Sequence, residues 1–265
     1  MTIIARAGQL ELRLVRRGPE VAAAQRLRYR VFYEELGAVP SVGTRARRAD
    51  ADAFDRLADH LVVVDLDRSR PHEPFAVGCY RLLRGSAADG PDGFYTALEF
   101  DLGGITAPVG ELMELGRSCV EPGYRTGAVM QLLWRGIADY VDAHRVGLML
   151  GCASLPGTDP DAVAAPLSYL HHRHLASPGL RPRALTHRLV RTDRLAAEAI
   201  DGRAVPRLLP PLLKAYLRMG GMIGEGAVID RQFNTIDVCL VLPTAQVVAP
   251  YQRRYRQHRP AAAAA

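Results

Sequence analysis

Two aspartates three residues apart, Asp52 and Asp55, lie shortly before an expected strand that begins at His60. On a helix this spacing places both carboxylates on one face, where like charges repel each other unless a cation lies between them. A diamine or another cationic substrate would supply that cation. A metal ion is the weaker candidate because no histidine or cysteine joins the pair. The alternative is a solvated helix face, or a pair that interacts with the dipole at a helix N-terminus.

Three further charged residues lie in segments with strand character. Arg81 falls within the apolar run 75–83, where a buried charge is costly unless it is paired; otherwise it points to solvent at a strand edge. Glu114 and Arg117 lie in an expected strand over 110–120, and strict alternation would send their side chains to opposite faces. They share a site only if the strand carries a bulge, for which Gly116 is the expected place. Otherwise one of the two is a surface charge.

A turn that contains glycine, from Glu121 to Gly127, joins this strand to an expected helix over 126–144. Free backbone N–H groups at such a helix start bind phosphate, and the guanidinium of Arg125 would add a charge-assisted pair. The motif is weak by itself, because many folds that bind nothing contain a glycine and an arginine at a helix entry.

Hydrophobic periodicity predicts the elements that would position these residues, and their order indicates a mixed α/β sheet with helices packed on it. The expected helices cover 20–36, 126–144, 161–175 and 208–219, with a loop over 38–51. The expected strands cover 11–16, 60–65, 75–83, 110–120, 146–153, 185–190, 226–229 and 236–242. We expect a single domain over 1–243 and a basic, flexible tail over 244–265. The apolar stripe of 208–219 is expected to be core, or alternatively a membrane contact or an acyl groove.

Composition narrows the class of protein. The chain has 265 residues, 48% of them apolar, which excludes a disordered or fibrous protein. Its net charge is +6, and 33 of its 34 basic residues are arginines, which favours an anionic partner, although codon usage is an alternative explanation. The N-terminal segment lacks the apolar core of a signal peptide, and the four cysteines are widely spaced. We therefore expect a cytoplasmic protein with reduced, structural thiols.

The segment from Glu114 to Ala143 resembles the cofactor-binding segment of the GNAT acyltransferase superfamily. In that superfamily a splayed strand pair and a helix N-terminus hold the pantetheine and phosphate of an acyl thioester. The usual R-x-x-G-x-G/A motif is degraded here, since Arg125-Thr-Gly127-Ala-Val-Met130 is one residue short and lacks the last glycine. That departure argues against an ordinary acetyl-coenzyme A donor.

A narrower resemblance covers roughly residues 10 to 243. The first half is similar, in order and spacing, to the acyl-homoserine lactone synthases and to the ornithine lipid acyltransferases, also described as hemolysin-like. The motifs that carry this similarity are Arg28-x-x-x-Phe32, Asp52-x-x-Asp55, Val77-Gly-Cys-Tyr-Arg81-Leu-Leu and Glu114-x-x-Arg117. Only the ornithine lipid acyltransferases continue into segments like those at 209–220 and 224–238. The combined set is specific, whereas each short motif alone is not.

The resemblance implies a GNAT-like mixed central sheet flanked by helices, with a C-terminal extension. It also implies transfer of a 3-hydroxyacyl chain from acyl carrier protein to the α-amino group of ornithine, forming lyso-ornithine lipid. The donor group is then the carrier's phosphopantetheine, and neither a permanently bound cofactor nor a metal is expected. An anionic inner-membrane surface is a further expected partner, with peripheral attachment there, and nucleic acid is not.

The resemblance also implies roles for individual residues. Glu114 is expected to be the catalytic base or to anchor a water that acts as one. Arg81 and Arg117 are expected to hold Glu114 and the polar end of a substrate. Asp52 and Asp55 are expected to position the cationic amino acid, and Arg28 and Phe32 to shape the substrate entrance. The residues expected to contact the acyl donor are Val120, Arg125 and Gly127.

Two other functions remain open from the sequence. One is synthesis of an acyl-homoserine lactone from S-adenosylmethionine, which the long C-terminal half disfavours. The other is a module without catalytic activity that binds a carrier protein or a membrane.

Overall fold

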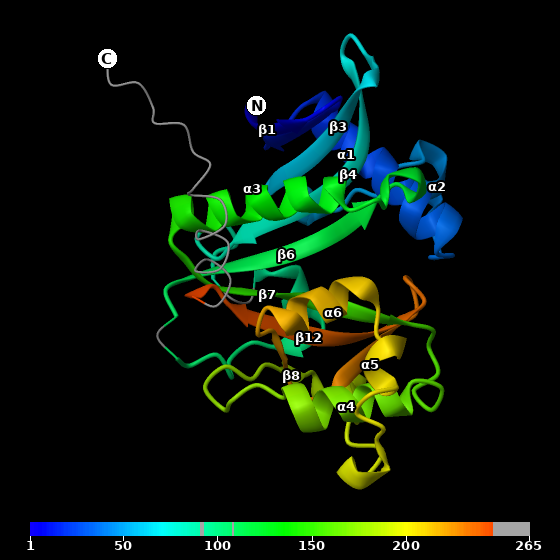
Figure 1. Ribbon diagram of the computed structural model, residues 1–265, viewed down its shortest axis with the longest axis vertical. Helices are drawn as coiled ribbons and strands as arrows, with labels where there is room; N and C mark the ends of the chain where they lie inside the picture. The colour runs from blue at the N-terminus through cyan, green and yellow to red at the C-terminus, as the bar shows by residue number, and fades with distance from the viewer. Residues whose placement is uncertain (91–92, 108, 246–265) are drawn as a thin grey trace.

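The computed structural model describes residues 1–90, 93–107 and 109–245 (Figure 1). Across these residues the centre is a ten-stranded sheet in the order β1-β2-β3-β4-β6-β7-β12-β11-β9, with β10 beside β12. β6 and β7 run parallel, and the other neighbours in this order are antiparallel. The mixed α/β architecture expected from the sequence is confirmed.

The elements have the following bounds. The strands of the large sheet are β1 (Thr2–Ala7), β2 (Leu10–Val15), β3 (Asp59–Arg70), β4 (Glu73–Arg84), β6 (Glu111–Val120), β7 (Val146–Pro156), β9 (Leu189–Val190), β10 (Met222–Ile223), β11 (Ala227–Asp230) and β12 (Thr235–Pro243), while β5 (Phe100–Asp101) and β8 (Arg183–Ala184) form a separate pair. The α-helices are α1 (Pro19–Arg28), α2 (Val42–Arg47), α3 (Ala128–His144), α4 (Ala164–His174), α5 (Val205–Leu208) and α6 (Pro211–Arg218). The other helical segments are the π-helix η1 (Tyr29–Glu35) and the 3-10 turns η2 (Ala53–Arg56), η4 (Tyr95–Leu98), η5 (Pro122–Tyr124), η6 (Thr186–Arg188) and η7 (Ala197–Ala199).

Helices cover both faces of the sheet, because β3 is apolar on each side. Leu61 and Val63 pack in the same core cluster as the buried face of α3. Val62 and Val64, which alternation places on the opposite face, pack with the apolar residues of α1. The site described below lies at the C-terminal end of α1.

The parallel strands β6 and β7 separate partway along their length. Their paired residues end at Glu114 and Leu150. Beyond that point β6 continues to pair with β4, and β7 continues to pair with β12. Figure 1 shows the two strands diverging toward the right of the view. Close approach at the point of separation requires glycine, since a Cβ on Gly151 would lie 2.4 Å from the carbonyl oxygen of Leu115.

The helix expected over 20–36 forms, but it is α-helical only to Arg28 and continues as the π-helix η1. Other local predictions are wrong. The loop expected over 38–51 contains α2, whose first turn is capped by the side chain of Ser41. The strand expected over 185–190 is replaced by η6 and the two residues of β9, and β1 was not expected.

The C-terminal half completes the sheet. β12 inserts beside β7, so the sheet continues from β6 through β7 into strands from the end of the chain. The stripe over 208–219 is mostly core: Leu209, Leu213 and Tyr216 are buried, although Leu208 is exposed. Thr244 is buried and bonded to the carbonyl of Val146. The rest of the expected tail, from 246 onward, lies outside the described residues.

Among the described residues no helix combines the length and the apolar character that crossing a bilayer requires.

Candidate active site

A bulge in β6 brings Glu114 and Arg117 around one site. Arg81 of β4 pairs with Gly116 and Cys79 pairs with Cys119, so two residues of β6 lie opposite one of β4. The extra residue is Arg117, whose φ of 50° is rare outside glycine. The bulge therefore exists, but it lies at Arg117 rather than at Gly116, because Gly116 stays in register with Arg81.

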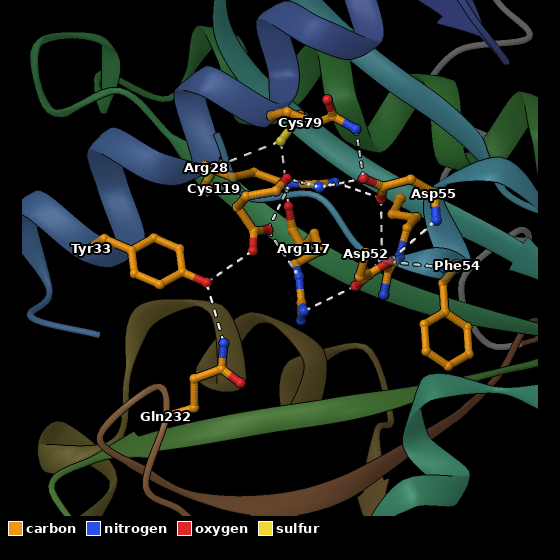
Figure 2. Close-up of polar contacts among 12 residues, drawn as sticks. Arg28, Tyr33, Asp52, Phe54, Asp55, Cys79, Arg117, Cys119 and Gln232 are labelled. Atoms are coloured by element: carbon orange, nitrogen blue, oxygen red, sulfur yellow. Dashed lines mark hydrogen bonds and ion pairs between the residues drawn. The ribbon is translucent and has the colours of Figure 1, made fainter. Parts of the chain in front are cut away.

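Three arginines and three aspartates form a closed ring of alternating charge (Figure 2). Each arginine contacts two aspartates, and each aspartate contacts two arginines. The contacts are Arg28–Asp50 (2.9 Å), Arg28–Asp55 (2.6 Å), Arg81–Asp55 (3.1 Å), Arg81–Asp52 (2.6 Å), Arg117–Asp52 (3.1 Å) and Arg117–Asp50 (3.1 Å). We call this set the arginine–aspartate ring; it joins α1, η2, β4 and β6.

The ring keeps its carboxylates ionised inside the protein. Burial by itself would raise the pKa of Asp55, but hydrogen bonds and charge from Arg28, together with the charge of Arg81, hold that pKa well below its usual range. Burial also acts on Asp52, and the charge and hydrogen bonds of Arg81 again lower its pKa. A buried charge that lost its partner would be costly, so the six residues depend on one another.

This pairing changes the interpretation of the two aspartates. Asp52 and Asp55 were expected to gather around a cationic substrate, because their charges repel each other. The cations are instead Arg28, Arg81 and Arg117 of the same chain, so that reason for placing the substrate there no longer holds. Asp52 also caps η2 by accepting hydrogen bonds from two backbone N–H groups of its first turn, as the helix-dipole alternative expected.

Aromatic residues that the sequence analysis missed enclose the ring. The guanidinium of Arg117 lies 4.6 Å from the ring centre of Tyr95 and 4.9 Å from that of Phe233. Phe32 packs edge-on against Phe233 at 5.7 Å. Tyr33 donates a hydrogen bond to Asp50 at 3.1 Å, as Figure 2 shows. Phe32, which was grouped with Arg28, thus lies near Arg117 of the ring through their shared contact with Phe233.

Glu114 lies beside the ring without being part of it. In the described part of the chain the ion pairs of Arg81 and Arg117 go to aspartates, so the expectation that these arginines hold Glu114 directly is wrong. One oxygen of Glu114 instead accepts the backbone N–H of Thr96 at 2.8 Å. Glu114 is 2% exposed, and burial raises its pKa above the usual range although Thr96 and the arginines act against this.

Gly116 leaves a polar space between Arg81 and Glu114. A Cβ at this glycine would lie 3.6 Å from Nε and 3.7 Å from Nη2 of Arg81, and 3.7 Å from Oε1 of Glu114. Those two nitrogens of Arg81 are buried and have no hydrogen-bond partner among the described residues. Two donors and one acceptor therefore border a space at the point where β6 leaves β7.

The residues expected at the acyl donor lie together at the start of α3. Gly127 is the N-cap residue, with a φ of 99° that favours glycine, and no heavy atom lies within 4 Å of the position of a Cβ. Arg125 donates to the carbonyl of Val120 at 3.1 Å and binds Glu35 through two contacts of 2.6 and 2.7 Å. The guanidinium of Arg125 is thus held by a carboxylate of this chain.

A second polar cluster, which the sequence analysis did not assemble, lies where β7 pairs with β12. Ligand-capable atoms of Glu99, Cys152 and Asp237 all lie within 4.8 Å of one another. Burial raises the pKa of Glu99 to about 7, and the charge of Asp237 adds to this effect. Burial likewise raises the pKa of Asp237 to about 6. We call this set the acidic cluster.

Glu99 of the acidic cluster lines a cavity of about 370 Å³. The residues that line the cavity include Tyr95, Glu99, Arg188, Asp230 and Gln232. Tyr95 also contacts Arg117, so the cavity adjoins the arginine–aspartate ring. Glu99 gave no signal in the sequence, because it follows an apolar segment and belongs to no recognisable motif.

Comparison with known proteins places the chain in a family. Residues 27–135 match the family model described as an acetyltransferase (GNAT) domain. L-ornithine N(alpha)-acyltransferase of Rhodobacter capsulatus is 46% identical over 245 residues, which is 92% of this chain and 94% of that protein. The protein of the same name from Agrobacterium fabrum is 44% identical over 255 residues, covering 96% and 87%.

Among solved structures, the acyl-homoserine lactone synthase BjaI is similar with a TM-score of 0.48 and 12% identity, over 88% of this chain and 81% of that one. The mixed sheet with flanking helices is the GNAT-like α/β fold that the sequence predicts. Because its curated relatives share more than 40% identity over nearly the whole chain, the protein is an acyltransferase and belongs to the L-ornithine N(alpha)-acyltransferase family.

Proposed function

We propose that the enzyme transfers a 3-hydroxyacyl chain from the phosphopantetheine thioester of acyl carrier protein to the α-amino group of ornithine, forming lyso-ornithine lipid. The names of the relatives support ornithine as the acceptor. The observation that carries the chemistry is Glu114, a buried carboxylate with a raised pKa at the point where β6 and β7 separate.

Glu114 is the general base of this proposal. The α-amine reaches the site as an ammonium ion and must lose a proton before it can attack a thioester. Oε1 of Glu114 takes that proton directly, or through a water in the space beside Gly116 that also binds Nε and Nη2 of Arg81. A raised pKa suits this task, since a carboxylate with a higher pKa is a stronger base.

The transfer then follows as ordinary aminolysis. The amine nitrogen attacks the thioester carbonyl, and the carbonyl oxygen takes the negative charge. Backbone N–H groups of β6 between Glu114 and Val120 are the proposed donors to this oxyanion. The C–S bond breaks as the nitrogen gives up a second proton and the amide forms; one of the two protons lost by the nitrogen goes to the pantetheine thiolate, and the other passes through Glu114 to solvent. The mechanism requires no covalent acyl-enzyme, because donor and acceptor meet in one site.

The acyl donor enters between β6 and β7. We place its phosphate at the N-terminus of α3, where Gly127 leaves the backbone exposed and the helix dipole favours an anion. Val120 and Arg125 would border the pantetheine arm at the end of β6. Arg125 reaches a phosphate only by sharing its guanidinium with Glu35.

The arginine–aspartate ring acts as a support in this proposal. Asp52 and Asp55 hold Arg81 so that its remaining donors face Glu114. Arg28 secures Asp55 from the other side. Arg117 lies next to the cavity through its contact with Tyr95, and Phe32 packs behind Arg117 through Phe233. Residues 1–243 would act as one unit, since the sheet runs from β1 through β12.

The reaction is tested by incubating the purified protein with 3-hydroxyacyl carrier protein and either ornithine or S-adenosylmethionine. We expect thiol release that depends on ornithine and a product with the mass of an N-acylornithine. Release that depends on S-adenosylmethionine instead would identify a homoserine lactone synthase, and the absence of release with both would contradict catalysis of this kind.

The role of Glu114 is tested by Glu114→Gln, which should lower kcat about 100- to 10,000-fold, the range for loss of a general base. Glu111→Gln is the matched control on the same strand, where Glu111 bonds only to Ser86 in the described hydrogen bonds. Circular dichroism should show both variants folded. A wild-type rate in Glu114→Gln would remove this residue from the mechanism.

A further inference from the structure

The acidic cluster has more negative charge than its neighbours balance. Glu99 contacts Arg188 at 3.2 Å, and its other oxygen accepts from the thiol of Cys152 at 3.4 Å. Asp237 is 4% exposed, and its Oδ1 has no hydrogen-bond partner among the residues that the structure describes. Asp230 adds a third carboxylate next to them, since its charge acts on both Glu99 and Asp237.

An empty arrangement of this kind is unfavourable. Burying an ionised carboxylate without a partner is costly, and the raised pKa values of Glu99 and Asp237 express that cost. A bound cation would remove it by pairing with the two charges. The arginine–aspartate ring differs in this respect, because its six charges already balance.

The acidic cluster lies a short chain of contacts away from Glu114. Thr96 donates its N–H to Glu114 at 2.8 Å, and its Oγ1 lies 3.9 Å from the sulfur of Cys152. Cys152 in turn contacts Glu99. Glu114 and the acidic cluster thus lie on two sides of one buried residue, Thr96.

The cation that fits is an ammonium group and not a metal ion. A metal ion would displace the thiol proton that Cys152 donates to Glu99, whereas an ammonium group adds to the donors around Glu99 without displacing it. Arg188 already occupies one oxygen of Glu99. The cavity of about 370 Å³ that reaches Glu99 gives an organic molecule access.

We propose that Glu99 and Asp237 bind the side-chain ammonium of the amino-acid acceptor, and that this pair selects a diamino acid over amino acids with neutral side chains. The α-amine of the same molecule then lies toward Glu114. The proposal rests on the proposed acyl transfer to an amino acid and adds the residues that choose it.

The test compares ornithine with norvaline, which has the same carbon chain without the terminal amine. For the wild-type enzyme we expect kcat/KM to be at least about 30-fold higher with ornithine, since truncating one partner of a buried charge pair costs 2 kcal/mol or more. Glu99→Gln and Asp237→Asn should each reduce this ratio about tenfold or more, chiefly by lowering the ornithine value. Glu198→Gln, at an exposed acid on η7, should keep the wild-type ratio.

The outcomes are separable. If the wild-type enzyme acylates ornithine and norvaline equally well, or if both variants keep the wild-type ratio, the assignment of Glu99 and Asp237 is overturned while acyl transfer stands. Norvaline turnover in the variants confirms that they fold. A preference for ornithine that disappears on dialysis against a chelator and returns with Zn²⁺ would also overturn the assignment, in favour of a metal. Absence of amino-acid acylation in the wild-type enzyme would instead contradict the proposed function.

Discussion

Arg81 connects the two halves of the candidate site. One nitrogen contacts Asp52 and Asp55, and the other two face the space beside Gly116 and Glu114. An arginine fixed by two carboxylates loses the freedom to swing toward Glu114, so a direct ion pair between the two does not form. Glu114 keeps its raised pKa for this reason, since a contact ion pair would lower it.

The residues that the sequence could identify are those within short motifs. Arg28, Asp52, Asp55, Arg81 and Arg117 were all selected, and the structure brings all five together. Their mutual pairing was not predictable, because a motif shows which residues matter and not which of them meet. Two acids belong to no sequence motif: Asp50, which completes the ring, and Glu99 of the acidic cluster. The folded sheet brings each of them next to its partners.

Asp237→Asn should stabilise the protein at high pH. The pKa of Asp237 is about 6 in the folded chain against 3.8 in a free side chain. The unfolded chain therefore loses this proton first, and stability falls as pH rises from about 4 to 6, then levels off. The neutral amide removes that loss, and the gain in the free energy of unfolding is at most about 3 kcal/mol at pH 8.

Urea unfolding of wild-type and Asp237→Asn protein at pH 4.5 and pH 8 measures this effect. The gain should be several times larger at pH 8, where the wild-type carboxylate is ionised. The same difference at both pH values would show that the ionised form of Asp237 is not strained. Together with the expected loss of ornithine preference, a more stable variant would indicate that stability is given up here for binding.

At the scale of elements, periodicity predicted the long strands and α3, whose buried apolar side chains belong to one core cluster. It failed where the backbone follows tertiary contacts. The π-helix η1 follows α1 directly but takes more residues per turn, which shifts the phase of its side chains. In this form Tyr33 contacts Asp50 and Phe32 contacts Phe233. The bulge lies at Arg117, one residue after the glycine at which it was expected. Arg117 has a positive φ, which usually favours glycine, and the ion pairs of its side chain with Asp50 and Asp52 stabilise that backbone conformation.

The arginine–aspartate ring should contribute much more stability than a surface ion pair. Arg28→Met leaves Asp50 and Asp55 each without one buried partner, and we expect the free energy of unfolding to fall by about 3–5 kcal/mol. Arg125→Met is the matched control, since Arg125 also binds a carboxylate through two contacts but is 45% exposed. Its loss should cost about 1 kcal/mol or less.

Chemical denaturation at pH 7 compares these two variants. Equal losses of stability would contradict a buried ring as a cooperative support. Because Asp52 and Asp55 have lowered pKa values in the folded chain, their contribution is present above about pH 4 and is lost as the pH falls further. Arg28→Met and wild-type protein should therefore converge in stability only under strongly acidic conditions.

At the scale of the molecule, the excess of arginine takes on a more specific meaning. Several arginines that the sequence offered as contacts for an anionic partner are used inside the protein: Arg28, Arg81 and Arg117 are paired in the ring. The net charge of +6 is thus carried by the other basic residues of the chain. An acidic carrier protein would be attracted to this charge as a whole.

Salt should therefore affect the two substrates differently. We expect kcat/KM for the acyl carrier protein to fall about tenfold between 50 and 300 mM NaCl, because attraction between exposed charges is screened. The KM for ornithine should change little, because the acidic cluster is buried and salt screens buried pairs less. A carrier kcat/KM that is insensitive to salt would contradict electrostatic recognition of the donor.

The separation of β6 from β7 also bears on how the chain is made. Residues 151–156 of β7 pair with β12 and not with β6, so their backbone partners lie on a strand that begins only at Thr235. During synthesis the backbone N–H and C=O groups of this half of β7 lack their β12 partners while residues 157–234 are added. An exposed edge of this kind invites pairing with another chain. The edge of β7 that faces β12 is thus a point of aggregation risk on the ribosome until the last strand docks, whereas the edge that faces β6 stays unpaired beyond Leu150 in the described part of the finished enzyme.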